Sequence, residues 1–305
     1  MTSLPLPPAG AWVRAGVRRP QPVDLAVLDV DGVLIDVEPS FRECVRGAVT
    51  RVQRLLGAEA AWTPTLHDVR VLKRAGGFND DIDTSIALTA LGLAGRGGDV
   101  AAVAAAVASA GGGLAGLRAA APELPRVPGK LVLRVFDELY WGADQFRARF
   151  GEEPEHDPPP QGLRTAEIAL AAPDLPARLR AGGVAHVAVV TGRTPLELED
   201  ALDRLCWQPG DLDAVVTGDL ARKPDPACLD RVIAPTGGRS LVYAGDVRDD
   251  WELVRRFRAE RDGSVNALGI IVGEEGPAMR ELGCDATLDS VTDLLSLLDW
   301  LAEDG

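Results

Sequence analysis

The sequence is poor in the side chains that form most zinc sites, disulfide frameworks and nucleophilic triads. Its three histidines, His67, His156 and His186, lie far apart and away from the expected strand ends, so a histidine triad is not expected. Its cysteines include no CxxC pair and no Cys/His pairing, which argues against a zinc site or disulfides and favours a reducing cytoplasm. The four cysteines are Cys44, Cys206, Cys228 and Cys284.

The sequence also lacks long apolar runs and an excess of basic residues. No run is long enough to span a bilayer. Residues 1–22 contain arginines and prolines but no continuous apolar segment, so we expect a flexible N-terminal extension rather than a signal peptide. The formal net charge of −14 disfavours nucleic acid and membrane surfaces as partners. A small phosphorylated metabolite stays compatible, because a metal ion can reverse the local field. The oligomeric state stays open, with a homodimer as one candidate.

Short apolar, β-branched runs alternate along the chain with amphipathic stretches of helical length. This alternation predicts an α/β fold with a doubly wound parallel sheet that is buried on both faces. The expected strands are Leu25–Val30, Val184–Val190, Ala214–Val216, Ser240–Ala244, Leu268–Val272 and Ala286–Leu288.

The gap between the first two expected strands is far longer than a crossover helix needs, so a domain is inserted there. We expect residues 23–38 and 161–305 to form the α/β core, and residues 39–160 to form an all-helical cap. Thr65 is a candidate helix cap, and the stretch "KLVLRVFDELYWGADQFRARFG" predicts one long helix. The Ala/Gly-rich segment of residues 101–125 is expected to be mobile or irregular. The Pro-rich stretch "EEPEHDPPPQG" is expected to be the return linker.

Polar residues follow four of the expected strands, at the edge where an open α/β sheet binds ligands. Any one of them, alone, would more often be a turn former or a helix cap. Together they supply the complementary groups of one metal and phosphate site. They are Asp29 and Asp31 before Gly32; Thr191, Gly192 and Arg193; Lys223 in "RKPDP"; and Asp246, Asp249 and Asp250 in "GDVRDD".

These four motifs, in this order, resemble those of the haloacid dehalogenase (HAD) superfamily, whose hydrolases use an aspartyl nucleophile. The matching stretches are "DVDG", "VVTGR", "RKPDP" and "GDVRDD". The resemblance covers most of the core and implies a Rossmann-like sheet domain. The helical insert falls where subfamily I carries its C1-type cap. Within the insert, "LKRAGGFNDD" resembles a subgroup of phosphatases with no assigned substrate.

The resemblance implies that Asp29 attacks phosphorus to form an aspartyl phosphate, and that Asp31 acts as general acid and then general base. Residues i and i+2 of an extended segment project to the same side, which agrees with this division of roles. Relatives that cleave carbon–halogen bonds usually lack an aspartate at the position of Asp31. Its presence therefore points to phosphoryl chemistry.

The resemblance also implies a Mg²⁺ ion and a phosphate-binding set, both suited to oxygen ligands and charge neutralisation. The metal ligands would be the Asp29 carboxylate, the Asp31 carbonyl and Asp246, with Asp250 binding directly or through water and Asp249 as its rival. Thr191, the Gly192 amide and Lys223 would hold the phosphoryl group. The candidates for contacting the leaving group are Lys73, Arg74, Asn79 and Arg193; helix-terminating or capping roles are an open alternative for the cap residues.

The expected function is that of a cytoplasmic, Mg²⁺-dependent phosphatase acting on a small soluble phosphomonoester. Two alternatives stay open. A phosphomutase acting on a sugar phosphate would share every core residue. A non-catalytic phosphate- or metal-binding module on the same fold would not need both the general acid and the metal ligands.

Overall fold

The computed structural model describes residues 6–17, 22–261 and 263–302. The chain divides into two compact units. The core unit comprises the described residues up to Asp36 and from Ile168 onward, and the cap unit spans Val37–Glu167. The boundaries expected from the sequence lie after residues 38 and 160.

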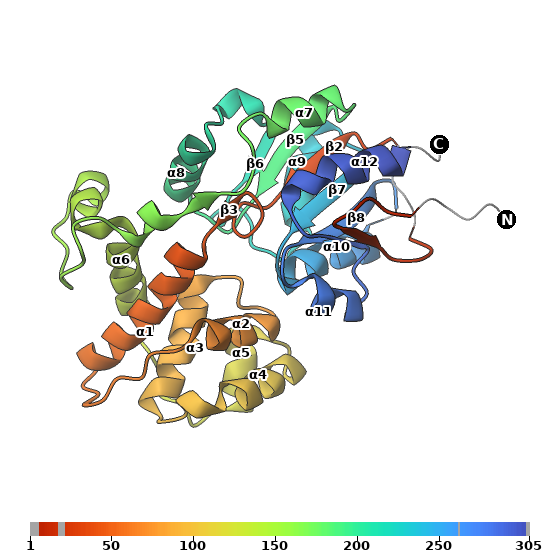
Figure 1. The fold of residues 1–305 in the computed structure, drawn as a ribbon. Coiled ribbons are helices and arrows are strands. Elements are labelled where there is room, and N and C mark those ends of the chain that lie inside the picture. Colours follow the sequence, from red (N-terminus) through yellow and green to blue (C-terminus); the bar gives the residue numbers. More distant parts are fainter. Residues whose placement is uncertain (1–5, 18–21, 262, 303–305) are drawn as a thin grey trace. The chain divides into compact units, whose positions relative to one another are not determined.

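The described part of the core unit contains a seven-stranded sheet with the order β1-β9-β8-β7-β2-β5-β6. Neighbouring strands are parallel except β1 and β9, and Figure 1 shows β5, β2, β7 and β8 side by side. The fold class expected from the sequence is therefore confirmed. The strands are β1 (Ala11–Val13), β2 (Leu25–Leu28), β5 (His186–Val190), β6 (Ala214–Val216), β7 (Ser240–Gly245), β8 (Asn266–Val272) and β9 (Ala286–Leu288); β3 (Ile35–Asp36) and β4 (Ile168–Ala169) form a separate two-stranded sheet.

The central strand β2 places the first motif in the middle of the sheet. All four residues of β2 are buried, as expected for a strand covered on both faces. Its neighbours are β5 and β7, with Leu25 opposite His186 and Leu241. The residues that follow β2, β5 and β7 therefore share one edge of the sheet. The core-unit helices are α7 (Leu175–Ala181), α8 (Pro195–Leu205), α9 (Ala227–Thr236), α10 (Arg248–Glu260), α11 (Gly276–Glu281) and α12 (Leu294–Ala302), with 3-10 turns at Pro209–Asp211 and Val291–Asp293.

The N-terminal segment corrects one expectation. Within the described residues it is not a loose extension, because β1 pairs antiparallel with β9. Trp12 packs against the hydrophobic core, and the Arg280 guanidinium lies 5.1 Å from its ring centroid. Three residues are too short to show a strand pattern; β1 forms because the unpaired edge of β9 offers it hydrogen bonds. The rest of the expected extension, residues 1–5 and 18–21, lies outside the described residues.

The cap unit is helical, as expected. The helix α1 (Glu43–Leu55) packs against α3 (Asp81–Leu93) and α6 (Gly129–Phe150), after a short π-helical turn at Glu38–Arg42. Thr65 begins α2 (Leu66–Arg74), and its hydroxyl accepts from the Asp68 amide. The expected long helix is interrupted: at Gly142, φ is 72° and ψ is 164°. A Cβ there would lie 2.2 Å from the Gly162 nitrogen, so a glycine at this position lets the return linker pass close to the interrupted helix.

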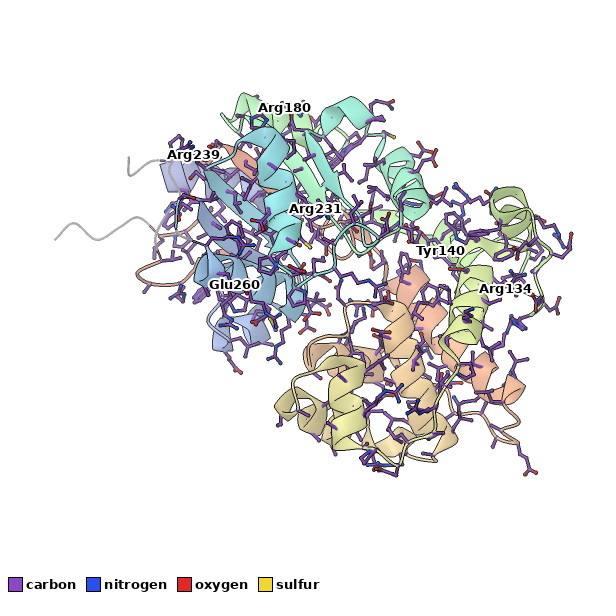
Figure 2. The ribbon with its side chains drawn as sticks, turned by 180° about the vertical axis from the view of Figure 1, so that it is seen from behind. Arg134, Tyr140, Arg180, Arg231, Arg239 and Glu260 are labelled. Atoms are coloured by element: carbon purple, nitrogen blue, oxygen red, sulfur yellow. The ribbon has the colours of Figure 1, made fainter. Side chains whose placement is uncertain are left out.

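Side chains of α6 hold the return linker. Figure 2 labels Arg134 and Tyr140 of this helix. The Arg134 Nε donates to Glu138 Oε1 at 2.7 Å, and the buried Glu138 carboxylate also accepts the Glu155 and His156 amides at 2.8 Å each. The linker is therefore fixed by a buried carboxylate with three donors. It runs into a 3-10 turn at Leu163–Ala166.

The Ala/Gly-rich segment is a second correction, because it is neither irregular nor without packing. It forms α4 (Val100–Ser109) and α5 (Gly113–Ala120), preceded by a 3-10 turn at Gly97–Asp99. The Gly113 amide donates to the Gly76 carbonyl at 2.9 Å. A Cβ on Gly112 would lie 2.5 Å from the same oxygen. Low side-chain volume thus lets this segment cross the Gly76–Gly77 turn closely.

No single helix among the described residues is both long enough and apolar enough to cross a membrane. Two consecutive helical segments, Gly97–Ser109 and Gly113–Ala120, would together be long and apolar enough by length and composition alone, but they are bent by 107°.

Candidate active site

Asp29 lies directly after β2, with its side chain almost fully buried. Its amide donates to the Ala244 carbonyl of β7 at 2.8 Å. One carboxylate oxygen, Oδ1, accepts from the Val30 amide at 2.8 Å, and Oδ2 accepts from Lys223 Nζ at 2.5 Å. The carboxylate that the sequence marks as the nucleophile is therefore held by one backbone and one ionic contact.

Lys223 follows β6 and precedes Pro224 through a cis peptide bond. Its side chain is 2% exposed, and Nζ donates to both Asp29 and Asp250 Oδ1, the latter at 2.7 Å. Burial alone would lower the pKa of Lys223, but Asp250 and Asp29 together raise it above the ordinary lysine value. The buried ammonium is therefore charged throughout the physiological pH range.

Asp250 lies in the first turn of α10 and accepts four hydrogen bonds. Its Oδ1 accepts from Lys223 and from the Tyr243 hydroxyl at 2.7 Å, and its Oδ2 accepts from the Asp246 and Val247 amides at 3.0 Å each. A carboxylate offers about four acceptor positions, so those of Asp250 are filled. A direct metal bond would displace one of these donors. The arrangement favours a role in which Asp250 holds Lys223 and the "GDVRDD" loop.

Tyr243 is a site residue that the sequence analysis missed. It lies on β7, where it is the one phenol in the apolar run "SLVYAG", and it is buried. Burial, and then the Asp250 charge, raises the pKa of the Tyr243 phenol well above its ordinary value, so the hydroxyl stays a donor. A single hydroxyl in a strand that is otherwise apolar was the available signal.

The carboxylates of Asp29, Asp246 and Asp250 form a group whose ligand oxygens lie within 4.8 Å of one another. Gly32 makes the approach of Asp246 possible: its φ is +74°, and a Cβ there would lie 2.1 Å from Asp246 Oδ2. Asp249 is also buried but is not a member of this group. The cluster therefore brings together oxygen donors from the first and last motifs.

The charge of the cluster fits a hard divalent cation. Burial raises the pKa of Asp29 well above its ordinary value; Lys223 opposes this rise, and Asp250, Asp246 and Asp31 add to it. The single positive charge of Lys223 thus does not balance the negative charge of the surrounding carboxylates. An oxygen-only donor set with excess negative charge is the kind that Mg²⁺ or Ca²⁺ takes. The Asp31 carbonyl, as a further ligand, stays a prediction.

The expected phosphate-binding loop follows β5. Thr191 is buried, its amide donates to the Val216 carbonyl at 2.9 Å, and its hydroxyl accepts from the Arg193 amide at 3.2 Å. Gly192 is exposed, and Gly218 packs on it so closely that a Cβ on Gly218 would lie 2.3 Å from the Gly192 carbonyl oxygen. The phosphate-binding roles of Thr191, Gly192 and Lys223 stay predictions.

Arg193, which the sequence predicts as a substrate contact, forms an ion pair with Asp31. Its Nε donates to Asp31 Oδ1 at 2.7 Å. The Arg193 side chain has no exposed surface, whereas that of Asp31 is 29% exposed. The sequence gives no sign of this pairing, because the two residues are separated by the whole cap.

Two of the cap candidates contact each other within the cap unit. Lys73 Nζ lies 2.8 Å from Asp81 Oδ1 and donates to the Asn79 carbonyl at 3.2 Å. Asp80, rather than Asn79, caps α3, through hydrogen bonds that its side chain accepts from the Ile82 and Asp83 amides. Substrate contact by Lys73 and Asn79 stays a prediction.

Comparison with known proteins gives structural matches only. No protein-family model and no curated protein matches the chain. Phosphatase Tt82 from Thermococcus thioreducens is 25% identical, with a TM-score of 0.60 over 89% of this chain and 98% of that one. CbbY from Rhodobacter sphaeroides, in complex with phosphate, is 17% identical, with a TM-score of 0.52 over 91% and 99%. A HAD family hydrolase from Deinococcus radiodurans R1, with bound phosphate and sodium, is 16% identical, with a TM-score of 0.50 over 92% and 98%. These similarities cover both the sheet and the helical insertion.

Proposed function

From the haloacid dehalogenase-type hydrolase fold that this chain has, we propose that it is a phosphatase that hydrolyses a small soluble phosphomonoester with Mg²⁺. The observation that carries the proposal is the buried contact of Lys223 with Asp29, beside the carboxylates of Asp246 and Asp250. A phosphatase among the similar structures, and phosphate bound in two of them, support the same chemistry.

The reaction divides into two displacements at phosphorus. In the first, an Asp29 oxygen forms a bond to phosphorus, the bond to the leaving oxygen breaks, and Asp31 gives its proton to that oxygen. In the second, Asp31 takes a proton from water as the water attacks phosphorus, and the bond to Asp29 breaks. Phosphate is released and both aspartates return to their starting states.

The other residues orient and balance charge. Lys223 holds Asp29 through Oδ2 and, when substrate binds, is placed to share its protons with a phosphoryl oxygen. Asp250 keeps Lys223 in place through the second contact of Nζ. A Mg²⁺ ion held by Asp29 and Asp246 would offset the electrostatic repulsion between the Asp29 carboxylate and the phosphate group of the substrate. We further propose that the protein acts in the cytoplasm on a phosphorylated metabolite.

The proposal is tested by phosphate release from a panel of small phosphomonoesters, measured with Mg²⁺ and with chelator. Wild type is compared with Asp29→Asn and with Asp203→Asn, an exposed α8 control. We expect metal-dependent release that Asp29→Asn abolishes and Asp203→Asn retains. Substantial activity in Asp29→Asn would refute the nucleophile.

The same panel separates the alternatives. Interconversion of sugar phosphate isomers without net release of phosphate would identify a mutase. If neither reaction occurs, binding of Mg²⁺ and of a phosphate analogue, measured by calorimetry, would identify a non-catalytic module.

A further inference from the structure

Arg193 is immobilised through both its main chain and its side chain. Its amide donates to Thr191 Oγ1 at 3.2 Å, and its carbonyl accepts from the Gly218 amide at 3.0 Å. Its Nη1 donates to the Glu197 carbonyl in α8 at 3.2 Å. The guanidinium is thus oriented before any ligand is present.

That fixed guanidinium is joined to Asp31 by the 2.7 Å bond from Nε to Oδ1. The arginine side chain has no exposed surface, and two of its three guanidinium nitrogens, Nε and Nη1, are held by Asp31 and Glu197. Asp31 keeps 29% of its side-chain surface exposed, so it is anchored and still accessible. An arginine suits this task, since its rigid, planar donor group fixes the direction of the carboxyl group that it holds.

We infer that Arg193 is a positioning residue for Asp31 and does not contact the substrate. By holding Oδ1, it directs the Asp31 carboxyl group toward the leaving oxygen. The inference rests on the proposed phosphatase function. It predicts that loss of Arg193 damages proton transfer to the leaving group and spares the attack by Asp29.

The choice of leaving group separates these two steps. An alkyl phosphate must have its leaving oxygen protonated, whereas p-nitrophenolate leaves with little help from an acid. The ratio kcat/KM reports only the steps up to departure of the leaving group. A defect of Asp31 as general base in the later hydrolysis of the aspartyl phosphate therefore does not change this ratio. Removing general acid catalysis costs about 100-fold or more in rate.

The experiment measures kcat/KM of wild type, Arg193→Lys and Arg193→Gln for p-nitrophenyl phosphate and for the best alkyl ester of the panel. We expect a loss of about 100-fold on the alkyl ester and of less than about fivefold on p-nitrophenyl phosphate. Asp31→Asn should show the same pattern. Combining Arg193→Lys with Asp31→Asn should add little further loss on the alkyl ester, because both changes remove one function.

Arg204→Lys, on the same helix α8, is the matched control and should leave both ratios unchanged; Arg204 pairs there with Asp200. Two Arg193 variants are used so that the test can still be made if one of them does not fold. Thermal unfolding shows which variants are folded. Equal losses on both esters, or no loss on either, would overturn the positioning role while leaving the phosphatase function intact. A wild type that releases phosphate from no ester would overturn the proposed function and this role with it.

Discussion

Lys223 and Asp250 form a buried ion pair in which Nζ lies 2.7 Å from Oδ1. The same Nζ reaches Asp29 at 2.5 Å, so one ammonium joins the last motif to the first. Breaking a buried pair by removing one partner is far more costly than losing an exposed pair, because the remaining charge has no solvent. Asp250 therefore influences Asp29 through the lysine between them.

The first prediction concerns Lys223→Met, which leaves two buried carboxylates without their cation. We expect the free energy of unfolding in chelator to fall by about 3 kcal/mol at pH 7. We also expect kcat to fall by about 100-fold or more with Mg²⁺. Because the folded pKa of Lys223 is raised, its stabilising contribution is complete below about pH 10 and is lost only as the pH rises through that raised value.

Urea unfolding followed by fluorescence measures the first effect, and phosphate release measures the second. Lys130→Met, at an exposed position of α6, is the control and should change neither. An unfolding free energy that is the same in Lys223→Met and wild type would show that the ion pair contributes nothing net.

The sheet was predictable from the sequence because its central strands β2, β5, β7 and β8 are almost wholly buried and so appear as continuous apolar runs. The expected bounds of Ala214–Val216 and Ala286–Leu288 agree with those of β6 and β9. The rule that ligands bind at strand ends then grouped Asp29 with Lys223 and Asp246, which the structure brings together.

The contacts that depend on side-chain direction could not be predicted. The pairing of Arg193 with Asp31 requires β5 to lie beside β2, and that of Tyr243 with Asp250 requires the start of α10 to fold back on β7. Strand order and rotamers decide both, and neither is visible in composition or periodicity. Similarly, β1 forms only because another strand leaves an edge open.

The second prediction tests the metal ligand Asp246. Asp246→Ala removes a carboxylate oxygen from the cluster around Asp29, so the Mg²⁺ concentration for half-maximal activity should rise by about tenfold or more. Asp249→Asn, which changes the rival carboxylate outside that cluster, should leave the Mg²⁺ titration unchanged. A shift in Asp249→Asn without one in Asp246→Ala would reverse the assignment.

The third prediction concerns the glycine crossing of the cap unit. At Gly112, φ is +80° and a Cβ would lie 2.5 Å from the Gly76 carbonyl; at Gly111, φ is +98° and no heavy atom lies within 4 Å of such a Cβ. Both changes to alanine carry the cost of positive φ, about 1–3 kcal/mol each. Only Gly112→Ala adds a clash with backbone.

Gly112→Ala should therefore lower the free energy of unfolding by at least about 1 kcal/mol more than Gly111→Ala. Urea unfolding of both variants measures the difference. Equal losses would mean that α4 and α5 move away from the Gly76–Gly77 turn at little cost.

The fourth prediction concerns the cysteines. Burial raises the pKa of the Cys228 and Cys284 thiols to about 11, and Cys44 is buried as well, whereas Cys206 is exposed. At pH 8 a thiol with that pKa is ionised in about one molecule in a thousand, and only the thiolate reacts.

A chromogenic disulfide reagent at pH 8 should therefore modify one thiol rapidly in the native protein and all four in denaturant. Cys206→Ser should abolish the rapid phase, and the slow phase should accelerate as the pH rises, since the thiolate fraction of the buried groups grows. The second influence on the Cys228 pKa is the Lys223 charge, which lowers it. A rapid phase that survives in Cys206→Ser would mean that at least one of the three buried thiols reacts in the native protein, which would contradict this prediction.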